Sequence, residues 1–313
     1  MGNDVNAEPC VALGGEGGPV DAYPGRDITL GGLTVTRVLP VRDRRLVGPW
    51  CFLDRFGPLS FSDAKPMDVA PHPHIGLQTV TWLLDGEILH DDSLGCEATA
   101  RPGGVNVMTA GGGIAHAEQT PRQHSGRLNG VQLWAALPDA TRHGNAAFQH
   151  VVEVPTADVH GGLVHVFAGS LGGVTSPAIH HSPICGAELR VHPGERLTFE
   201  VPRTFEHAAL LLDGDATSES MPFAPQVLYY FGSGRTEIAI SSRSGARVLF
   251  IGGPPFGETI LMWWNFVART PEEIASARAD WESGLRFGPV RGYAGTPLAA
   301  PPLARLARPE PIS

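Results

Sequence analysis

The stretch PHPHIGLQTVTWLLDGE, residues 71–87, places two histidines one residue apart immediately before an alternating apolar run. Side chains at positions i and i+2 of a β-strand point to the same face, so His72 and His74 would present both imidazole rings to one side. By itself the triplet His-Pro-His is a weak signal, because histidine beside proline is common in polar turns. The pair needs a partner elsewhere in the chain before it predicts a site.

Turn-forming residues punctuate the chain, which contains 39 glycines and 28 prolines in 313 residues. Short apolar runs recur between turn clusters such as LDGE, RPGG, HPGE and LDGD. Frequent short strands with this punctuation favour an all-β barrel or sandwich. The length favours two domains or one large β domain.

A short internal similarity supports two units. WLLDGEI at residues 82–88 resembles LLLDGDA at residues 210–216, an offset of 128 residues. Each segment reads as a buried strand that runs into a glycine turn, which suggests two copies of one β unit. A strand followed by Asp-Gly is common in β proteins, so coincidence remains the alternative.

One helix is expected near the C-terminus, in TPEEIASARADWESG at residues 270–284. Thr270 can cap it, Pro271 suits the first helical position and Glu273 completes a capping box. An apolar stripe on this helix would pack on the body of the protein; it comprises Ile274, Trp281 and Leu285. The chain beyond is rich in proline and alanine, which predicts an extended or partly disordered tail.

Charge and cysteine usage limit the partners and the compartment. There are 23 lysines and arginines against 32 aspartates and glutamates, a formal net charge of −9. This charge opposes attraction to phosphate backbones and anionic lipids, so we expect no direct nucleic-acid binding. No apolar stretch of about 18 residues predicts a membrane span. The chain shows no secretion signal, and its four cysteines, which form no CxxC motif, fit reduced thiols, so we expect a cytoplasmic protein; they are Cys10, Cys51, Cys96 and Cys185.

The partner for the histidine pair lies in MTAGGGIAHAEQTP, residues 108–121. His116 and Glu118 again stand at i and i+2, 42 residues after His74. This interval allows about three or four strands and turns, and a barrel can bring such strands side by side. Three neutral imidazoles and one carboxylate suit a divalent first-row metal such as iron, with positions left open for water or substrate.

The glycine run before His116 does not predict a phosphate-binding loop, because it lacks the GK[ST] ending and no helix pattern follows it. Its glycines would instead let the backbone pass close to neighbouring strands. The chain contains no GxSxG elbow and no cysteine in a nucleophile signature. Hydrolysis through a covalent intermediate is therefore unsupported.

Several segments together resemble the pirin family of bicupins. They are LVGPWCFLDRFGP (46–58), PHPHIGLQTVTWLLDGE (71–87), MTAGGGIAHAE (108–118), VQLWAALP (131–138) and GGPPFGETILMWWNFVARTPEEI (252–274). The resemblance covers about residues 28 to 290. It implies two cupin β-barrel domains packed face to face, with a short C-terminal helix.

The resemblance also implies a division of the chain. We expect an N-terminal extension (1–27), a metal-binding cupin (28–155), a second cupin without metal ligands plus the helix (156–290), and a Pro/Ala-rich tail (291–313).

The ligands of the family carry over onto positions of this chain, and they are His72, His74, His116 and Glu118. The metal is most often iron, so we expect Fe(II), although such ligand sets also accept manganese, copper, nickel or zinc. Three positions depart from the pattern of many relatives, which carry a basic residue, a glutamate and an arginine there; they are Ile75, Gln78 and Gly112. These departures put the substrate in doubt rather than the metal.

The second copy loses the ligands. The offset of 128 takes the first histidine pair to Glu200 and Pro202, and aligning the glycine runs takes the second pair to Glu237 and Ala239. We therefore expect one metal per chain. His192 and His207 in this half are expected to be surface or locally hydrogen-bonded imidazoles.

Five further histidines are expected in surface loops. His90 is flanked by acids and a turn, which favours a solvated loop over a contact behind the metal site. The others lie in polar or turn segments, and they are His124, His143, His180 and His181.

An open iron-like centre can bind a phenolate oxygen and activate O2, while a carboxylate accepts the proton of an incoming hydroxyl. The resemblance sharpens this chemistry, because several pirins cleave flavonols such as quercetin with O2 and release carbon monoxide. In that hypothesis Glu118 is both a ligand and the catalytic base. The alternative is a metal-dependent or redox-sensing regulatory protein that acts through a protein partner. A third hypothesis keeps the metal only for barrel stability, with a closed coordination shell.

Overall fold

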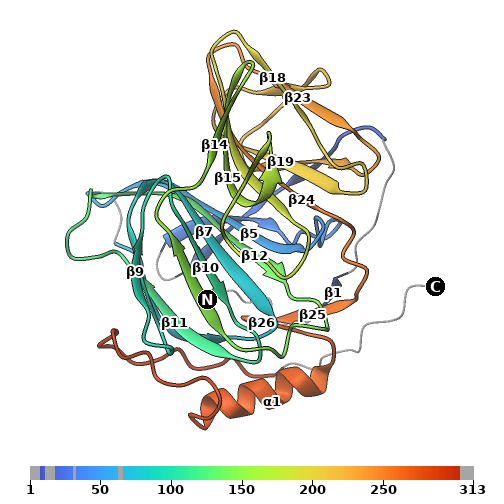
Figure 1. Ribbon diagram of the computed structural model, residues 1–313. Helices are drawn as coiled ribbons and strands as arrows, with labels where there is room; N and C mark the ends of the chain where they lie inside the picture. Colours follow the sequence, from blue (N-terminus) through green and yellow to red (C-terminus); the bar gives the residue numbers. More distant parts are fainter. Residues whose placement is uncertain (1–7, 11–17, 31–32, 63–65, 304–313) are drawn as a thin grey trace.

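The computed structural model describes residues 8–10, 18–30, 33–62 and 66–303. They form two β-barrels and one short helix (Figure 1). The predicted all-β architecture of two cupin barrels with a C-terminal helix is confirmed.

The first barrel is built from two sheets. The larger one has seven strands in the order β13 (Ala147–Val151), β10 (Val105–Thr109), β7 (Leu77–Gly86), β12 (Arg127–Ala136), β5 (Trp50–Ser60), β4 (Leu33–Leu39) and β3 (Arg26–Leu30). The smaller one has four strands in the order β6 (Asp68–His74), β11 (Ile114–Gln119), β8 (Ile88–Asp92) and β9 (Glu97–Ala100).

The second barrel repeats this plan. Its larger sheet has eight strands: β14 (Thr156–Val159), β15 (Gly162–Leu171), β17 (Cys185–Val191), β24 (Ala246–Gly253), β19 (Glu206–Gly214), β22 (Val227–Gly232), β2 (Asp21–Pro24), and β16 (Val174–Thr175), which pairs with β15. Its smaller sheet has four strands in the order β18 (Arg196–Glu200), β23 (Glu237–Ser241), β20 (Thr217–Ser218) and β21 (Met221–Pro222).

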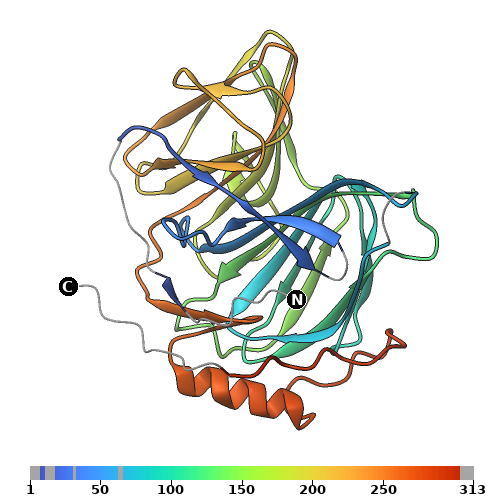
Figure 2. The ribbon, with the colours of Figure 1, turned by 180° about the vertical axis from the view of Figure 1, so that it is seen from behind.

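The two larger sheets pack face to face and share one apolar core (Figures 1 and 2). Val80 and Trp82 of β7 lie in this core together with Leu210 of β19. Burial of this apolar surface is the main force that holds the barrels together. The Trp82 Nε1 group also donates a hydrogen bond to Oε2 of the fully buried Glu188, at 2.9 Å, so this buried indole N–H has a partner.

The N-terminal segment connects both barrels. Strand β2 pairs with β22 of the second barrel, whereas β3, two residues later, pairs with β4 of the first. The segment expected as an extension, residues 1–27, thus supplies an edge strand to the second barrel and the start of one in the first.

The chain after β24 returns to the first barrel. Strands β25 (Ile260–Trp263) and β26 (Phe266–Ala268) form a three-stranded sheet with β1 (Glu8–Cys10), and helix α1 (Pro271–Glu282) follows. Phe266 bridges to Ile75, directly after β6. The structure therefore places the helix against the first barrel, although it follows the second barrel in sequence (Figure 1).

Helix α1 begins as predicted: Thr270 is the N-cap and accepts from the Glu273 amide, and Pro271 is the first helical residue. Ile274 is fully buried on the first barrel. The expected stripe is wrong at Leu285, which lies beyond the end of the helix and is 60% exposed.

The C-terminal tail packs more closely than its composition indicates. No strand or helix forms in residues 291–303, yet Ala300 is buried beside α1. The Leu298 amide donates to the Pro71 carbonyl at 2.8 Å, so this segment lies along β6. Proline and alanine exclude regular structure here but still offer apolar surface for burial. Residues 304–313 of the predicted tail lie outside the described residues.

No helix in the described part of the chain is long and apolar enough to cross a membrane, which agrees with the hydropathy of the sequence.

The expectation for His207 is wrong. The side chain is fully buried in β19 and stacks on Phe250 at 5.4 Å between ring centroids. Neither ring nitrogen has a hydrogen-bond partner among the described residues. Burial lowers the pKa of His207 to about 4. The sequence gives no sign of this burial, because it depends on a strand that is covered on both faces.

We predict that acid destabilises the metal-free protein partly through His207. The folded pKa of about 4 lies below the ordinary value of 6.5, so the unfolded chain binds more protons between these limits. Stability should therefore fall as the pH falls from 6.5 toward 4, and His207 should contribute about 2 kcal/mol of that loss between pH 7 and pH 5. Urea unfolding at the two pH values measures it. His207→Leu should reduce the pH dependence while His192→Leu, at an exposed position, should not; equal pH dependence in both variants would contradict the account.

Candidate metal centre

Two neighbouring strands bring the predicted histidines together. Strands β6 and β11 are antiparallel, and their register pairs His72 with His116 and His74 with Ile114. The opposite face of these strands is covered by an apolar layer from β26, α1 and the segment after it, which buries Ile75 and Ala115. Alternation along each strand therefore turns the three imidazoles into the barrel.

The three rings form one compact, enclosed cluster. One ring nitrogen from each of His72, His74 and His116 lies within 4.8 Å of the other two. The side chains are 6%, 1% and 1% exposed, respectively. The cluster could hold a metal ion.

Hydrogen bonds fix the orientation of each ring. The Nδ1 group of His72 donates to the Ala70 carbonyl at 2.9 Å, and that of His74 donates to the Asn265 carbonyl at 3.1 Å. A carbonyl oxygen only accepts, so both rings carry their proton on Nδ1 and a lone pair on Nε2. The Nδ1 atom of His116 lies 3.3 Å from Nδ1 of His90.

The inner nitrogens of two of the rings lie close together. The Nε2 atoms of His74 and His116 are 3.0 Å apart. A ring protonated on Nδ1, as His74 is, has only a lone pair at Nε2; when His116 is in the same tautomer, the two lone pairs repel at this separation unless a cation lies between them. Two ligands that meet at a right angle at about 2.1 Å from a metal are separated by about 3.0 Å, so the donor set fits a divalent ion.

Burial keeps the three rings neutral. Desolvation lowers the pKa of His72 to about 4 and lowers the pKa values of His74 and His116 well below the ordinary value. Neutral imidazole is the form that binds metal, so at neutral pH the three rings could bind a metal ion without first losing protons.

Glu118 stays outside this cluster. Its carboxylate is not among the ligand atoms that gather within 4.8 Å, and the pairing of β11 with β6 shifts register between His116 and Glu118. Gln132 of β12 donates from Nε2 to Glu118 Oε1 at 3.4 Å, and the Thr81 hydroxyl donates to Gln132 Oε1 at 2.8 Å. Burial raises the pKa of the Glu118 carboxyl.

The expectation for His90 is wrong. It is 3% exposed and lies on β8, next to β11, with its Nδ1 atom facing His116. The ring of Phe148 stacks on it at 4.1 Å between centroids. The flanking acids and the turn indicate a loop. The prediction fails because the pairing of β8 with β11, which buries His90, cannot be seen in the sequence.

The other histidines divide between surface and interior. The prediction is confirmed for the three exposed residues His124, His143 and His181. It is wrong for His180, which is half-buried and donates from Nδ1 to Gln78 Oε1 at 3.3 Å. Burial lowers the pKa of His180 to about 4.

An aromatic wall lies beside the cluster inside the barrel. The Trp134 ring meets His74 edge to face at 5.2 Å, and Phe52 stacks on Trp134 at 3.9 Å. The Arg37 guanidinium lies 4.4 Å from the Phe52 ring centre and forms an ion pair with Asp54. The wall keeps the surroundings of His74 apolar.

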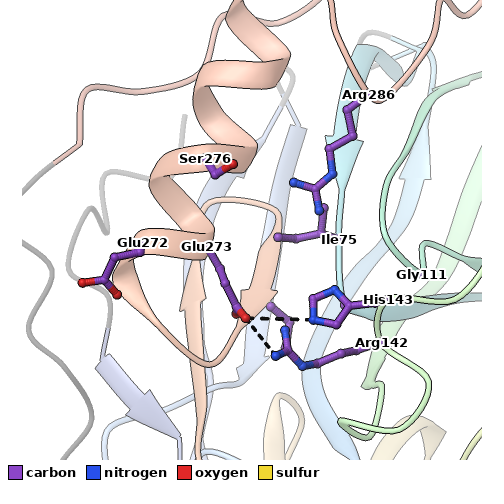
Figure 3. Close-up of a pocket in the computed structure, with 10 residues that line it drawn as sticks. Ile75, Gly111, Arg142, His143, Glu272, Glu273, Ser276 and Arg286 are labelled. Atoms are coloured by element: carbon purple, nitrogen blue, oxygen red, sulfur yellow. Dashed lines mark hydrogen bonds and ion pairs between the residues drawn. The ribbon is translucent and has the colours of Figure 1, made fainter.

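A cavity of about 350 Å³ lies on the opposite side of the same sheet, between the barrel and α1 (Figure 3). Ile75 and Gly111 line it, but none of the three clustered histidines does. Glu273 pairs there with Arg142 at 2.8 Å and with His143 at 4.0 Å (Figure 3). These charges satisfy one another and anchor the start of the helix.

Comparison with known proteins gives consistent likenesses. Residues 32–135 match the Pirin family and residues 186–288 match the Pirin C-terminal cupin domain. The chain is 44% identical over 276 residues to the "Putative quercetin 2,3-dioxygenase" of Pseudomonas aeruginosa, with 87% of each protein covered. It is 36% identical over 270 residues to the "Pirin-like protein" of Caulobacter vibrioides, with 84% of this chain and 92% of that protein covered.

A solved structure agrees. The crystal structure of quercetin 2,3-dioxygenase from Acinetobacter baumannii is 39% identical, with a TM-score of 0.89, and the match covers 92% of this chain and 97% of that one.

We predict that the double variant His72→Ala with His74→Ala loses bound metal and keeps its β-structure. Two of the three convergent nitrogens disappear, while the outer apolar layer that holds β6 remains. Elemental analysis after loading with Fe(II) gives the stoichiometry, and circular dichroism gives the fold. His124→Ala with His181→Ala serves as the matched control at exposed positions. An unchanged metal content in the first double variant would show that the ligands lie elsewhere.

Proposed function

The chain belongs to the pirin family, and from this premise we propose that it is a flavonol dioxygenase of the quercetin 2,3-dioxygenase type, with one metal in the first barrel. The single observation that carries the proposal is the convergence of one ring nitrogen from each of three buried histidines in an enclosed site. The likeness to proteins with quercetin 2,3-dioxygenase names, at 44% and 39% identity, supports the substrate class.

In this proposal His72, His74 and His116 hold the metal, which we propose to be Fe(II). A divalent iron with open positions supplies Lewis acidity and a site for O2 chemistry. The protein contributes three neutral ligands whose orientation is fixed by the hydrogen bonds on their outer nitrogens. The aromatic wall of Trp134 and Phe52 limits the access of water to His74.

We assign two roles to Glu118, those of fourth ligand and catalytic base. It lies on the same face of β11 as His116, two residues further along the strand. A carboxyl whose pKa is raised by burial accepts a proton more readily than a solvated one. The base would take the proton of the flavonol 3-hydroxyl, which prepares the substrate for oxygen addition, ring cleavage and release of carbon monoxide.

The hydrogen bonds around Glu118 suit this role. Thr81 donates to the oxygen of the Gln132 amide, which leaves the amide nitrogen to face the Glu118 carboxylate. The hydrogen bond from Gln132 to Glu118 is long, at 3.4 Å, and therefore weak. It orients the carboxylate but leaves it free to move toward the three histidines.

We place the reaction in the cytoplasm. Cys96 and Cys185 are free thiols in the described part of the chain. Unpaired cysteines of this kind are typical of a reducing compartment.

We predict that the Fe(II)-loaded protein consumes O2 with a flavonol and bleaches the absorbance of the flavonol. Loss of the base should lower kcat by about 10²–10⁴-fold in Glu118→Gln. An oxygen electrode and an absorbance trace measure both, across several flavonols, after anaerobic loading.

The control is Glu195→Gln, a matched change at an exposed position of the second barrel that should leave the rate unchanged. Absence of turnover with every flavonol would end the dioxygenase proposal. A wild-type kcat in Glu118→Gln would remove the role of Glu118 as the base and leave the rest intact.

A further inference from the structure

We propose that Asp92 and His90 are positioning residues of the metal centre: together they decide which nitrogen of His116 carries its proton, and so whether His116 can bind a metal. This inference rests on metal binding by the three histidines. It concerns two buried side chains that the proposed chemistry does not use.

The three groups form one buried chain of contacts. His116 Nδ1 lies 3.3 Å from His90 Nδ1, and His90 Nε2 lies 3.1 Å from Asp92 Oδ2. The exposed fractions are 1%, 3% and 2% for His116, His90 and Asp92. The pairing of β8 with β11 sets this geometry, because it places Asp92 opposite His116.

Backbone amides fix the Asp92 carboxylate at the outer end of this series of contacts. Oδ1 of Asp92 accepts from the Leu94 amide at 2.9 Å and from the Cys96 amide at 3.0 Å. Oδ2 is thereby aimed at His90. Phe148 stacks on His90 with 9° between the ring planes, which holds the imidazole in the plane that both contacts require.

The proton positions follow from the two ends. A carboxylate only accepts, so His90 donates from Nε2 to Asp92. A neutral His90 then has a lone pair on Nδ1, which accepts from Nδ1 of His116. His116 is left with its lone pair on Nε2, the nitrogen that faces His74 at 3.0 Å.

His116 needs this arrangement more than the other two ligands do. His72 and His74 are held by backbone carbonyls, which accept and never donate. His90 can accept or donate at Nδ1, so its own partner at Nε2 determines which nitrogen of His116 carries the proton. Asp92 is that partner, and because its carboxylate only accepts, it fixes the tautomer of His90 and through it that of His116.

Asp92→Asn reverses the direction of these hydrogen bonds, and the side chains keep their shape and position. The amide oxygen can keep both backbone hydrogen bonds, while the amide nitrogen faces His90 and donates to Nε2. His90 then donates from Nδ1 to His116, whose proton moves to Nε2. The metal-facing nitrogen would lose its lone pair, so we expect metal affinity to fall by about 10–100-fold.

The test uses Zn(II) as a diamagnetic probe and the full chain. Competition with a chelator gives the Kd of the wild type, Asp92→Asn, His90→Phe and His90→Gln. Phe fills the space of the imidazole without an acceptor, so His90→Phe should weaken binding. The Gln side chain offers an oxygen toward His116 and an NH2 toward Asp92, so His90→Gln should recover part of the loss. Asp158→Asn, at an exposed position of β14, is the matched control and should bind as the wild type does.

A spectroscopic readout separates this role from a merely structural one. Long-range ¹H–¹⁵N correlation spectra of the Zn(II)-loaded wild type should show His116 protonated on Nδ1 and His90 protonated on Nε2. In metal-free Asp92→Asn the proton of His90 should appear on Nδ1 and that of His116 on Nε2.

The outcomes distinguish this inference from the proposal it rests on. Unchanged Zn(II) affinity in both Asp92→Asn and His90→Phe, with binding lost when His72 and His74 are replaced, would overturn the role of Asp92 and His90 alone. Absence of Zn(II) binding by the wild type would overturn the metal site and this inference with it.

Discussion

Three imidazole nitrogens that converge inside a closed barrel are the constraint on which the rest of this structure depends. Each ring of the cluster has its outer nitrogen engaged, and the backbone carbonyls that accept from His72 and His74 leave the inner nitrogens of these two rings with nothing to donate. The inner nitrogens of His74 and His116 are 3.0 Å apart, and in the tautomer that we propose for His116 their lone pairs face each other, an arrangement that a cation would make favourable. The fold thus holds together a site that could bind a metal ion.

The parts of the chain that hold the cluster in place come from far apart in the sequence. The sheet that carries the cluster is covered on its outer face by β26, helix α1 and the segment that follows, with Ile274 and Phe287 buried against it. A strand buried on both faces has no solvent side to which a histidine could turn. The second barrel contributes differently, because it packs on the opposite sheet of the first barrel through a shared apolar core. Within its described residues, the C-terminal third of the chain contributes no side chain to the histidine cluster and still helps to position it.

The sequence predicted the fold and the centre of the site because both depend on short-range pattern. Two pairs at i and i+2, with strand alternation, were enough to gather His72, His74 and His116. What depends on long-range pairing was missed. His90 looked solvated beside its acidic neighbours, and only the pairing of β8 with β11 places it behind His116. His207 is buried by the strands around it, and Ala300 by a helix that precedes it. For Glu118 the two-residue spacing gave the correct face of the strand, but the register shift beside it sets where its carboxylate lies.

The most direct test of the account is anomalous diffraction from crystals of the Fe(II)-loaded protein, collected on both sides of the iron edge. The account predicts a single anomalous peak per chain, bounded by the Nε2 atoms of His72, His74 and His116. A peak at any other position, or three histidines that point apart around no peak at all, would contradict it.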